Sequence, residues 1–417
     1  MIFTVQIFGL KINTMKYLKT VCILFSIVAF TNCIDKKYDS EKKTIKQWYK
    51  GNLHTHSYWS DGDEFPEVIV DWYQSNAYHF IALSDHNILA EGDKWITISK
   101  DSIYQMAFKN YLEKYGEDWV NHRLDSGRIQ VKLKTHEEYK KRYEQKGKFL
   151  IIRSEEITDR FEDKHVHVNA TNIQHKIEPK GGHSILEVLQ NNIDAVNKQR
   201  LETGTPMIPH INHPNFFYSV SLEDMMALKG ERFFEVFNGH PMVHNLGDSI
   251  HMSTEEMWDQ INISYIENNK PLMYGLATDD THHYHVKDSK WSNAGRGWIM
   301  VQADSLTPAS LIDAMEKGSF YATTGVKLKE LVFDENKLSV EVAQETGINY
   351  TISFIGCRKG QSKTEEFESI EGTMATFELN DDILFVRCKI TSTKLHYNPI
   401  ENILYEMAWT QPVVKNN

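Results

Sequence analysis

Residues 51–87 read GNLHTHSYWSDGDEFPEVIVDWYQSNAYHFIALSDHN, and this stretch decides how the rest of the chain is interpreted. A short apolar approach ends in the letters HTH at 54–56, and Asp61 follows in a glycine-containing turn. A helix-like segment then leads to the apolar run 80–83, which passes directly into the letters SDH at 84–86. The stretch therefore predicts strand, turn, helix and strand, with metal-type ligands at the carboxyl end of each strand.

The spacing of the first two histidines has a physical meaning. Residues two apart on a strand point to the same face, so His54 and His56 can both face one cavity and bind one ion. Two histidines at this spacing are common on short strands. Their combination with Asp61 and a second strand that ends in Asp85-His86 is much rarer by chance, and it indicates a metal site.

Composition places the chain among soluble globular proteins. Its 417 residues are enough for two domains and a large core. It is 41% hydrophobic and 25% charged, which is ordinary for that class. The formal net charge of -11 excludes a general basic face, and no helix-turn-helix or aromatic-basic strip is present, so we expect no nucleic-acid partner. The 19 histidines are a high count.

The amino-terminal stretch resembles an export leader. A short basic region at 15–19 precedes an apolar run at 21–30, which is too short for a membrane-spanning helix. Cys33 then occupies the position of the lipidated cysteine of a bacterial lipoprotein, although Asn32 is larger than the usual preceding residue. A plain signal peptide and an uncleaved anchor are the alternatives. We expect an exported lipoprotein of a bacterial envelope, periplasmic or at the cell surface, attached to the membrane through Cys33, with 34–50 as a polar tether.

Strand-like and helix-like segments alternate after the tether, which predicts a parallel sheet or barrel. The seven strand candidates are residues 51–56, 80–86, 149–157, 165–170, 207–213, 233–238 and 272–280. Almost every one ends in a polar group or a potential ligand, as expected where active sites lie at the carboxyl ends of strands. Capped helix starts are indicated at Ser184, Ser221, Ser253 and Thr307.

The predicted organisation has four parts. They are a leader at 1–33, a tether at 34–50, a barrel at 51–325 with a polar, helix-rich insertion at 88–148, and a carboxyl-terminal domain at 326–417. The insertion follows a barrel strand, so we expect it to shape the mouth of the site.

The carboxyl-terminal domain is predicted to be a small β-sandwich, because short strand candidates recur at regular spacing. The candidates are 329–333, 338–342, 350–355, 374–379, 383–390 and 403–409. They carry no ligand cluster, which indicates a packing or interaction role. Cys357 and Cys388 lie here, and a disulfide and two buried free thiols are equally compatible with the sequence.

Later strands add further ligand-type residues. Glu155 and Glu156 end one strand, His165 and His167 lie in HVHVNA, His210 and His213 lie in PHINHP, and Asp280 and His282 lie in ATDDTHHYH. Over roughly residues 51–325 this order resembles the PHP (polymerase and histidinol phosphatase) family of metal-dependent phosphoesterases. The insertion and the carboxyl-terminal β domain are similar to the group that includes carbaryl hydrolase.

The resemblance implies an α/β fold with a distorted, TIM-like barrel of seven βα units and a full set of nine metal ligands. These fall on His54, His56, Asp61, His86, Glu156, His167, His213, Asp280 and His282. Two assignments have alternatives. His165 shares a strand face with His167, and only one of Glu155 and Glu156 can reach the interior, because neighbouring residues point to opposite faces.

Imidazole and carboxylate ligands suit two or three Zn²⁺, Mn²⁺ or Fe²⁺ ions. Such a site suits a small anionic substrate, most readily a phosphate ester. Glu156 and Asp280 are the expected catalytic residues through the ions that they hold. Arg296, in GRGW, is the candidate for binding the substrate anion, with a salt bridge beside the barrel as the alternative.

Three functions fit these features. The first is a phosphoesterase in which water activated by bound ions attacks phosphorus. The second is a metallohydrolase of carboxylic or carbamic esters or amides. The third is a binding protein on a barrel that has lost catalysis. A basic pocket would favour the first and an aromatic pocket the second. The aromatic residues near the site leave this open; they are Tyr58, Trp59, Phe216, Phe217 and Tyr218.

Overall fold

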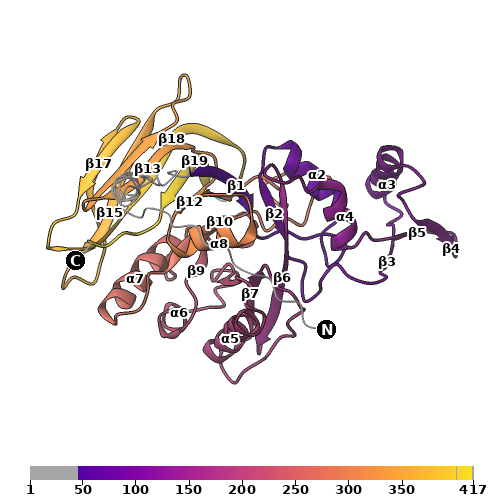
Figure 1. Cartoon of the computed structure of the whole chain (residues 1–417), viewed down its shortest axis with the longest axis horizontal. Coiled ribbons are helices and arrows are strands. Elements are labelled where there is room, and N and C mark those ends of the chain that lie inside the picture. The colour runs from indigo at the N-terminus through magenta and orange to yellow at the C-terminus, as the bar shows by residue number, and fades with distance from the viewer. Residues whose placement is uncertain (1–45, 401, 416–417) are drawn as a thin grey trace, which may run out of the picture. The chain divides into compact units, whose positions relative to one another are not determined.

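The computed structural model describes residues 46–400 and 402–415, which form an α/β protein (Figure 1). The predicted leader and the lipidation at Cys33 lie outside the described residues. Within the described part, a central sheet of 13 strands has helices packed against it, and a second, 3-stranded sheet lies near the carboxyl terminus. No helix of this part combines the length and the apolar character needed to cross a membrane.

All seven predicted strands of the first domain are present. In chain order they are β1 (Gln47–Asn52), β2 (Phe80–Leu83), β6 (Leu150–Phe161), β7 (Lys164–Thr171), β8 (Ile208–Ile211), β9 (Phe233–Asn238) and β10 (Tyr274–Thr278). They lie side by side in the same order. β2, β8, β9 and β10 are buried along their whole length, as expected for strands covered on both faces.

One strand of this group runs against the predicted direction. β1, β2 and β6 are parallel, and so are β8, β9 and β10, but β7 is antiparallel to both of its neighbours. Glu162 and Asp163 join β6 to β7 in a tight turn, with Glu162 in the left-handed region at φ 53°. So short a connection permits only antiparallel pairing. His167 therefore reaches the site from the first half of β7.

The outer strands of the group, β1 and β10, meet just beyond their carboxyl ends. Thr55 and Thr281 form an isolated parallel bridge. The Asp280 amide donates to the His54 carbonyl at 2.9 Å, and the His56 amide donates to the Thr281 carbonyl at 2.9 Å. Among the described residues this bridge, and no longer ladder, joins the two ends of the group. The architecture is thus a large sheet whose seven-strand part is joined end to end at one point.

Four of the five described helices outside the insertion begin at the predicted caps. The five are α2 (Pro66–Ser75), α5 (Ile185–Thr203), α6 (Leu222–Ala227), α7 (Thr254–Glu267) and α8 (Pro308–Glu316). The other helix, α2, begins after Phe65 without a side-chain cap. The side chains of Ser184, Ser221, Ser253 and Thr307 each accept a hydrogen bond from the backbone amide three residues later. These bonds satisfy amides that a helix start leaves without a partner.

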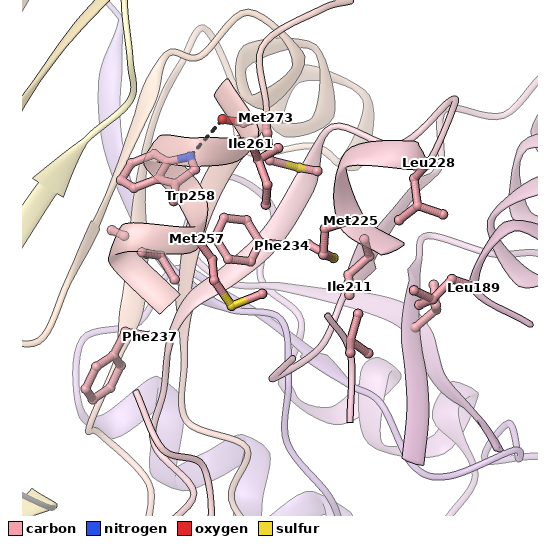
Figure 2. Packing of buried hydrophobic residues seen from close by; sticks show 14 of the residues in the cluster. Leu189, Ile211, Met225, Leu228, Phe234, Phe237, Met257, Trp258, Ile261 and Met273 are labelled. Carbon is pink, nitrogen blue, oxygen red and sulfur yellow. Dashed lines mark hydrogen bonds between the residues drawn. The ribbon is translucent and has the colours of Figure 1, made fainter. Parts of the chain in front are cut away.

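The helices bury apolar side chains against the outer face of the sheet (Figure 2). Trp258 of α7 packs in this cluster, and its indole nitrogen donates to the Met273 carbonyl at 2.8 Å. Phe234 and Val236 of β9 belong to the same cluster. Since side chains alternate along a strand, Glu235 between them points to the opposite, inner face.

The insertion is helical only in part. It contains α3 (Ser102–Tyr115), α4 (His136–Tyr143) and a sheet that was not predicted, formed by β3 (Trp95–Thr97), β5 (Arg128–Lys132) and β4 (His122–Asp125). Phe65 stacks on Tyr111 of α3 with ring centroids 3.9 Å apart. Trp59 donates from its indole nitrogen to the Lys134 carbonyl at 2.9 Å. The insertion thereby fixes both ends of the segment that carries Asp61.

The carboxyl-terminal strands extend the central sheet. β11 (Trp298–Ala303) pairs with β1, β12 (Phe320–Thr323) pairs with β11, and β19 (Ile403–Thr410) pairs with β12. The Gln411 side chain accepts from the Gly275 amide at 2.8 Å and donates to the Gly275 carbonyl at 2.9 Å. The chain end is thus bound to β10 as well as to β12.

The six predicted carboxyl-terminal strands are all present, together with one more. They are β13 (Leu328–Asp334), β14 (Lys337–Val342), β15 (Tyr350–Arg358), β17 (Met374–Glu378), β18 (Ile383–Ile400) and β19, and the additional strand is β16 (Glu365–Glu371). β13, β14 and β17 form the separate sheet, which shares a core with β15 and β18. Cys357 and Cys388 are both buried and form no disulfide.

Candidate metal centre

All nine residues predicted as metal ligands lie together at the end of the sheet where β1 and β10 meet. His54, His56 and Asp61 follow β1, His86 follows β2, Glu156 lies in β6, His167 lies in β7, His213 follows β8, and Asp280 and His282 follow β10. They form overlapping groups in which the potential ligand atoms lie within 4.8 Å of one another. The carboxyl ends of neighbouring parallel strands meet at one edge, which is why residues far apart in sequence converge here.

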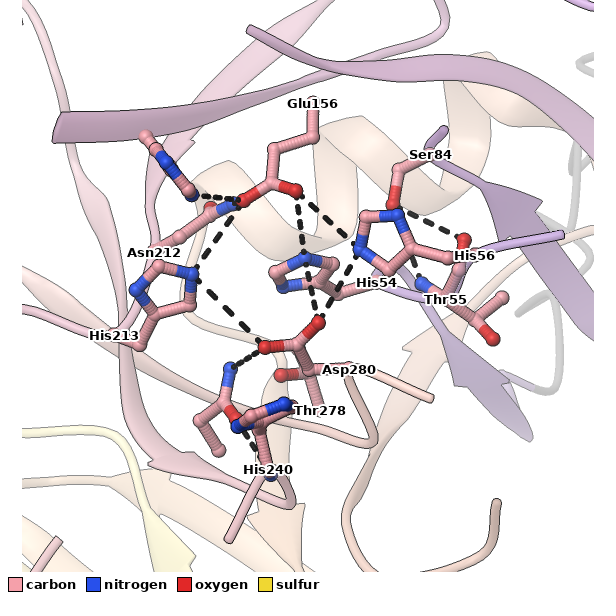
Figure 3. Close-up of polar contacts among 12 residues, drawn as sticks. His54, Thr55, His56, Ser84, Glu156, Asn212, His213, His240, Thr278 and Asp280 are labelled. Atoms are coloured by element: carbon pink, nitrogen blue, oxygen red, sulfur yellow. Dashed lines mark hydrogen bonds and ion pairs between the residues drawn. The ribbon is translucent and has the colours of Figure 1, made fainter. Parts of the chain in front are cut away.

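Two carboxylates and two histidines form the centre of this cluster (Figure 3). The Nε2 atom of His54 lies 3.4 Å from Glu156 Oε2 and 3.2 Å from Asp280 Oδ1. The Nε2 atom of His56 lies 3.3 Å and 3.2 Å from the same two oxygens. Two imidazole nitrogens and two carboxylate oxygens thus surround one small volume.

The second oxygen of Glu156 faces another part of the cluster. Glu156 Oε1 lies 2.9 Å from His167 Nδ1 and 3.5 Å from His213 Nε2, and the Asn212 side-chain amide donates to it at 2.6 Å. On the other side, His86 Nδ1 lies 2.8 Å from Glu156 Oε2. Glu156 therefore belongs to two different groups of potential ligands, one with His54 and His56 and one with His86 and His167.

Asp61 forms the outer edge of the cluster. Its carboxylate lies 3.4 Å from His86 Nε2 and 3.5 Å from His282 Nε2. The Asp61 side chain is 57% exposed, whereas those of His54, His56 and Glu156 are fully buried. The cluster consequently opens to solvent on the side of Asp61.

Four buried atoms of the cluster lack a hydrogen-bond partner among the described residues. They are His54 Nε2, His56 Nε2, His167 Nε2 and Glu156 Oε2. A buried polar atom without a partner is unfavourable, so convergent atoms of this kind are an observation that calls for a ligand. Imidazole nitrogens with a carboxylate oxygen are a donor set that fits a divalent transition metal. The residues present therefore fit the ions that the sequence predicts.

The electrostatics of the cluster point the same way. Burial would raise the pKa of Glu156, but the charges of His86 and His54 hold it well below its usual value. Burial would likewise raise the pKa of Asp280, and His54 keeps it low. Burial alone would lower the pKa of His54, whereas Asp280 and Glu235 raise it well above normal. Buried carboxylates that require nearby positive charge are stabilised by a bound cation.

Sequence analysis missed one central residue, Glu235. Its Oε1 atom lies 2.6 Å from His54 Nδ1 and accepts from the Thr278 hydroxyl at 2.8 Å. Its Oε2 atom accepts from the His213 amide at 2.9 Å and from the Asn238 side-chain amide at 2.8 Å. The signal that could have revealed it is a lone carboxylate in the middle of the apolar strand FFEVF at 233–237.

Glu235 orients the ligand groups around it. A carboxylate can only accept a hydrogen bond, so His54 Nδ1 is the donor and Nε2 is the ring atom that faces the cluster as a potential ligand. Asn238, which donates to Glu235, also donates to Asp280 Oδ2 at 3.1 Å. One buried carboxylate thus connects residues that follow β1, β8 and β10.

The two alternative ligands that the sequence left open, His165 and Glu155, lie outside the cluster. His165 packs its ring against Phe216, with centroids 5.3 Å apart. Glu155 faces away from the site and accepts from the Ile177 amide at 2.6 Å. His210, which was not predicted as a ligand, forms a further potential ligand group with His54 and Glu235, and its Nε2 atom lies 3.5 Å from Glu235 Oε1. Of the predicted pairs, the structure therefore brings Glu156 and His167 to the site.

Arg296 does not have the role that we predicted. Its side chain is buried, and all five N–H groups point at protein oxygens. The acceptors are the carbonyls of Gly239, Asp288, Trp291 and Asn398 and the side-chain oxygen of Asn398. No N–H group of Arg296 remains for a substrate anion. Its hydrogen bonds instead connect the segments that carry Gly239, Asp288, Trp291 and Asn398.

Aromatic rather than cationic side chains border the cluster. The Phe216 ring lies 5.0 Å from His213 and 5.9 Å from His240, measured between centroids. Among the hydrogen bonds and ion pairs of the described residues, none joins a lysine or arginine side chain to any of the nine predicted ligands. Apart from the histidines themselves, these contacts therefore bring no positively charged side chain to the predicted ligands.

Comparisons with known proteins give fold-level similarity only. No protein-family model matches the chain, and no curated protein matches it. Solved structures similar to it include a two-domain protein containing a predicted PHP-like metal-dependent phosphoesterase from Bacteroides vulgatus, at 15% identity and a TM-score of 0.39, covering 85% of this chain and 92% of the other.

Two further solved structures are similar over a shorter part of this chain. A proposed metal-dependent phosphoesterase from Bifidobacterium adolescentis has 11% identity and a TM-score of 0.28, covering 59% of this chain and 88% of the other. An amidohydrolase from Chromobacterium violaceum, with bound sulfate and no metal, has 13% identity and a TM-score of 0.27, covering 56% and 87%. Because these TM-scores are low, we base the proposal below on the chain's own residues.

Proposed function

We propose that this protein is a metal-dependent hydrolase of the PHP type, acting on a phosphoric ester. The observation that carries the proposal is the convergence of buried, unpartnered Nε2 atoms of His54 and His56 on the carboxylates of Glu156 and Asp280. We also propose that the seven strands form a closed barrel. The isolated bridge between Thr55 and Thr281, at the end of the strands where the ligand groups lie, supports this proposal.

Three subsites for ions follow from the side-chain groups. His54, His56, Glu156 and Asp280 would hold one ion, because their facing nitrogen and oxygen atoms lie 3.2 to 3.4 Å apart. Glu156 with His86 and His167 would hold a second. The outer group would hold a third, and it consists of His56, Asp61, His86 and His282. When bound, divalent ions supply Lewis acidity, which polarises an ester and lowers the pKa of water.

The charge balance favours an anionic substrate when all subsites are filled. Asp61, Glu156, Asp280 and the previously unrecognised Glu235 carry one negative charge each when ionised. Two divalent ions neutralise them, and a third leaves an excess of about two positive charges at a site without lysine or arginine. A phosphate ester would supply the matching negative charge.

A second function is favoured by a different observation. Phe216 covers one side of the cluster, and an aromatic border suits a neutral, apolar ester better than a polyol phosphate. A carboxylic or carbamic ester or amide hydrolase is therefore the alternative. The same ligand groups would serve it, because the nucleophile can attack carbon or phosphorus.

The test is metal content and turnover measured on the same preparation of the full chain in detergent. The substrates are p-nitrophenyl phosphate, bis-p-nitrophenyl phosphate and p-nitrophenyl acetate, each with Mn²⁺, Zn²⁺ or Fe²⁺. Two or three bound ions with phosphoester turnover are the expected result. Ions bound with acetate turnover alone would favour the second function, and bound ions without any turnover would overturn both.

We also propose that the protein is a lipoprotein of a bacterial envelope, on the basis of residues 15–33 alone. Labelling of cells with a palmitate analogue should mark the wild-type chain. Labelling that persists in Cys33→Ala would contradict lipidation at Cys33.

A further inference from the structure

A short aromatic segment follows the ligand-type residue His213 and leaves a large ring in solvent. Phe216 lies 4.6 Å from Phe217 between ring centroids, and Phe217 is 49% exposed. The two rings also pack against His165, at 5.3 Å and 5.8 Å. An apolar surface therefore begins at the metal centre and extends outward from it.

The backbone of this segment is strained. His213, Phe217 and Tyr218 have φ values of 22°, 50° and 49°, in the left-handed region that bulky residues avoid. Strain of this kind persists only where the surroundings impose it, and it concentrates at binding and catalytic sites. Here it turns the Phe217 ring outward instead of into the core.

Specific contacts hold the strained segment in place. The Asn215 side-chain amide donates to the carbonyls of His244 and Met252, both at 2.9 Å. The Tyr218 ring stacks on His251 with centroids 3.7 Å apart. Both contacts join the segment to the loop that follows β9, and they hold the backbone that carries the exposed rings in place.

The loop after β9 continues the apolar surface. Phe216 pairs with Val243 in an isolated antiparallel bridge. Four exposed apolar side chains lie in the same loop, namely Met242, Leu246, Ile250 and Met252, with exposures of 45%, 49%, 84% and 46%. Exposed apolar side chains that gather beside a polar cluster are typical of a binding surface.

We propose that Phe216 and Phe217 form a subsite for an aromatic or bulky apolar substituent of the ester cleaved at the metal centre. This inference rests on the proposed function and adds the substrate class to it. All N–H groups of Arg296 donate to protein oxygens, so Arg296 is not available to bind a substituent of the substrate. Beside Phe216 and Phe217, the described residues would therefore select the substituent by apolar contact. Sugar and polyol esters would place polar groups against these rings, so we expect them to be poorer substrates than aromatic esters.

The test uses pairs of esters that differ in the apolar substituent alone. Benzyl and ethyl alcohol have closely similar acidities, so benzyl phosphate and ethyl phosphate differ in binding rather than in leaving-group chemistry. Benzyl and ethyl acetate form the same pair for the alternative reaction. We expect the full, metal-loaded chain to prefer the benzyl ester by about tenfold or more in kcat/KM.

The informative variant is Phe217→Asn. It removes the exposed ring, and asparagine tolerates the left-handed backbone at this position, so the loop is retained. The benzyl-to-ethyl ratio should fall about tenfold while metal content stays the same. Tyr405→Ala removes an aromatic ring of similar exposure, 46%, from β19 and should leave the ratio unchanged.

Equilibrium binding separates this inference from the hydrolase proposal. Benzylphosphonate and ethylphosphonate are not hydrolysed, and calorimetry gives their relative affinities for the metal-loaded chain. Tighter binding of benzylphosphonate that is lost in Phe217→Asn, without turnover of any ester, would support the subsite and overturn the hydrolase. Turnover with equal rates for both esters, or a ratio that Phe217→Asn leaves unchanged, would overturn the subsite and retain the hydrolase.

Discussion

The Nδ1 atom of His54 donates to Glu235 Oε1 across 2.6 Å in the fully buried interior. The donor sits just after the first strand, and the acceptor sits in the strand that precedes the last one of the seven-strand group. This contact determines which His54 nitrogen faces the metal centre. Glu235 therefore positions a potential metal ligand, although Glu235 is not itself part of the ligand groups that contain Glu156.

Replacing Glu235 by glutamine should weaken metal binding. Glutamine keeps the size of the side chain but can present an N–H to His54 Nδ1, so the ring is no longer held in one tautomer. We expect Glu235→Gln to lower metal affinity by about 10- to 100-fold, measured by competition with a chromogenic chelator. Glu231→Gln is the matched control, because Glu231 is also buried but accepts from Tyr265, away from the site. Equal losses in both variants would contradict a positioning role for Glu235.

Two adjacent glutamates should behave differently. Glu156→Gln should abolish turnover and reduce the number of bound ions, because Glu156 contacts histidines on both of its oxygens. Glu155→Gln should retain ions and activity, since Glu155 instead accepts from the Ile177 amide. Metal analysis of the two purified variants is the measurement. Full metal content in Glu156→Gln would refute the assigned ligand groups.

Arg296 should contribute to stability. Arg296→Ala leaves several buried carbonyls without a donor, and we expect the free energy of unfolding to fall by about 3 kcal/mol or more. Arg296→Lys should recover little of this loss, because an ammonium cannot reproduce the planar set of five donors. Urea denaturation measures both variants. A folded Arg296→Ala protein of wild-type stability with a raised KM would restore the substrate-binding role that the sequence suggested.

Acid should weaken the contact between α7 and the carboxyl-terminal strands. Burial raises the pKa of Glu255, but Arg387 and Lys389 lower it to about 2, below its ordinary 4.5. The group therefore stabilises the fold above about pH 4.5, and this contribution is lost as the pH falls toward 2. Glu255→Gln should be less stable than wild type at pH 6, by on the order of 1 to 3 kcal/mol.

The difference between the Glu255→Gln and wild-type proteins should shrink by pH 3, as followed by urea denaturation. Glu368→Gln, at an exposed position of β16, is the control and should show no such trend. A difference that is constant across this pH range would show that Glu255 acts through its size rather than its charge.

The convergence of the nine ligand-type residues could be predicted because it depends on local rules. Side chains two apart on a strand share a face, as at His54 and His56, and the carboxyl ends of parallel strands meet. Glu235 obeys the same alternation, but a single acid within an apolar strand gives no pattern that repeats. Its partner is 181 residues away, and only the folded chain shows it.

Arg296 and β7 show what local rules leave out. A guanidinium in GRGW looks the same in the sequence whether it faces a substrate or, as here, Asn398 in β18. The direction of β7 depends on the length of one turn, which apolar runs alone do not reveal. β16 was missed because EEFESIE is rich in glutamate, and only pairing with β15 identifies it as a strand.

The contact of Gln411 with Gly275 constrains the order in which the chain can fold during synthesis. Gln411 forms two hydrogen bonds to the backbone of β10, the strand that leads to Asp280, and β19 pairs with β12. Until residues 403–411 have been synthesised, β12 and Gly275 lack these partners. A nascent chain stopped near residue 325 would expose the edge of β12 and an unsupported β10, a surface prone to aggregation. The edge of the sheet that leads to Asp280 can therefore complete its contacts only after residues 403–411 have been synthesised.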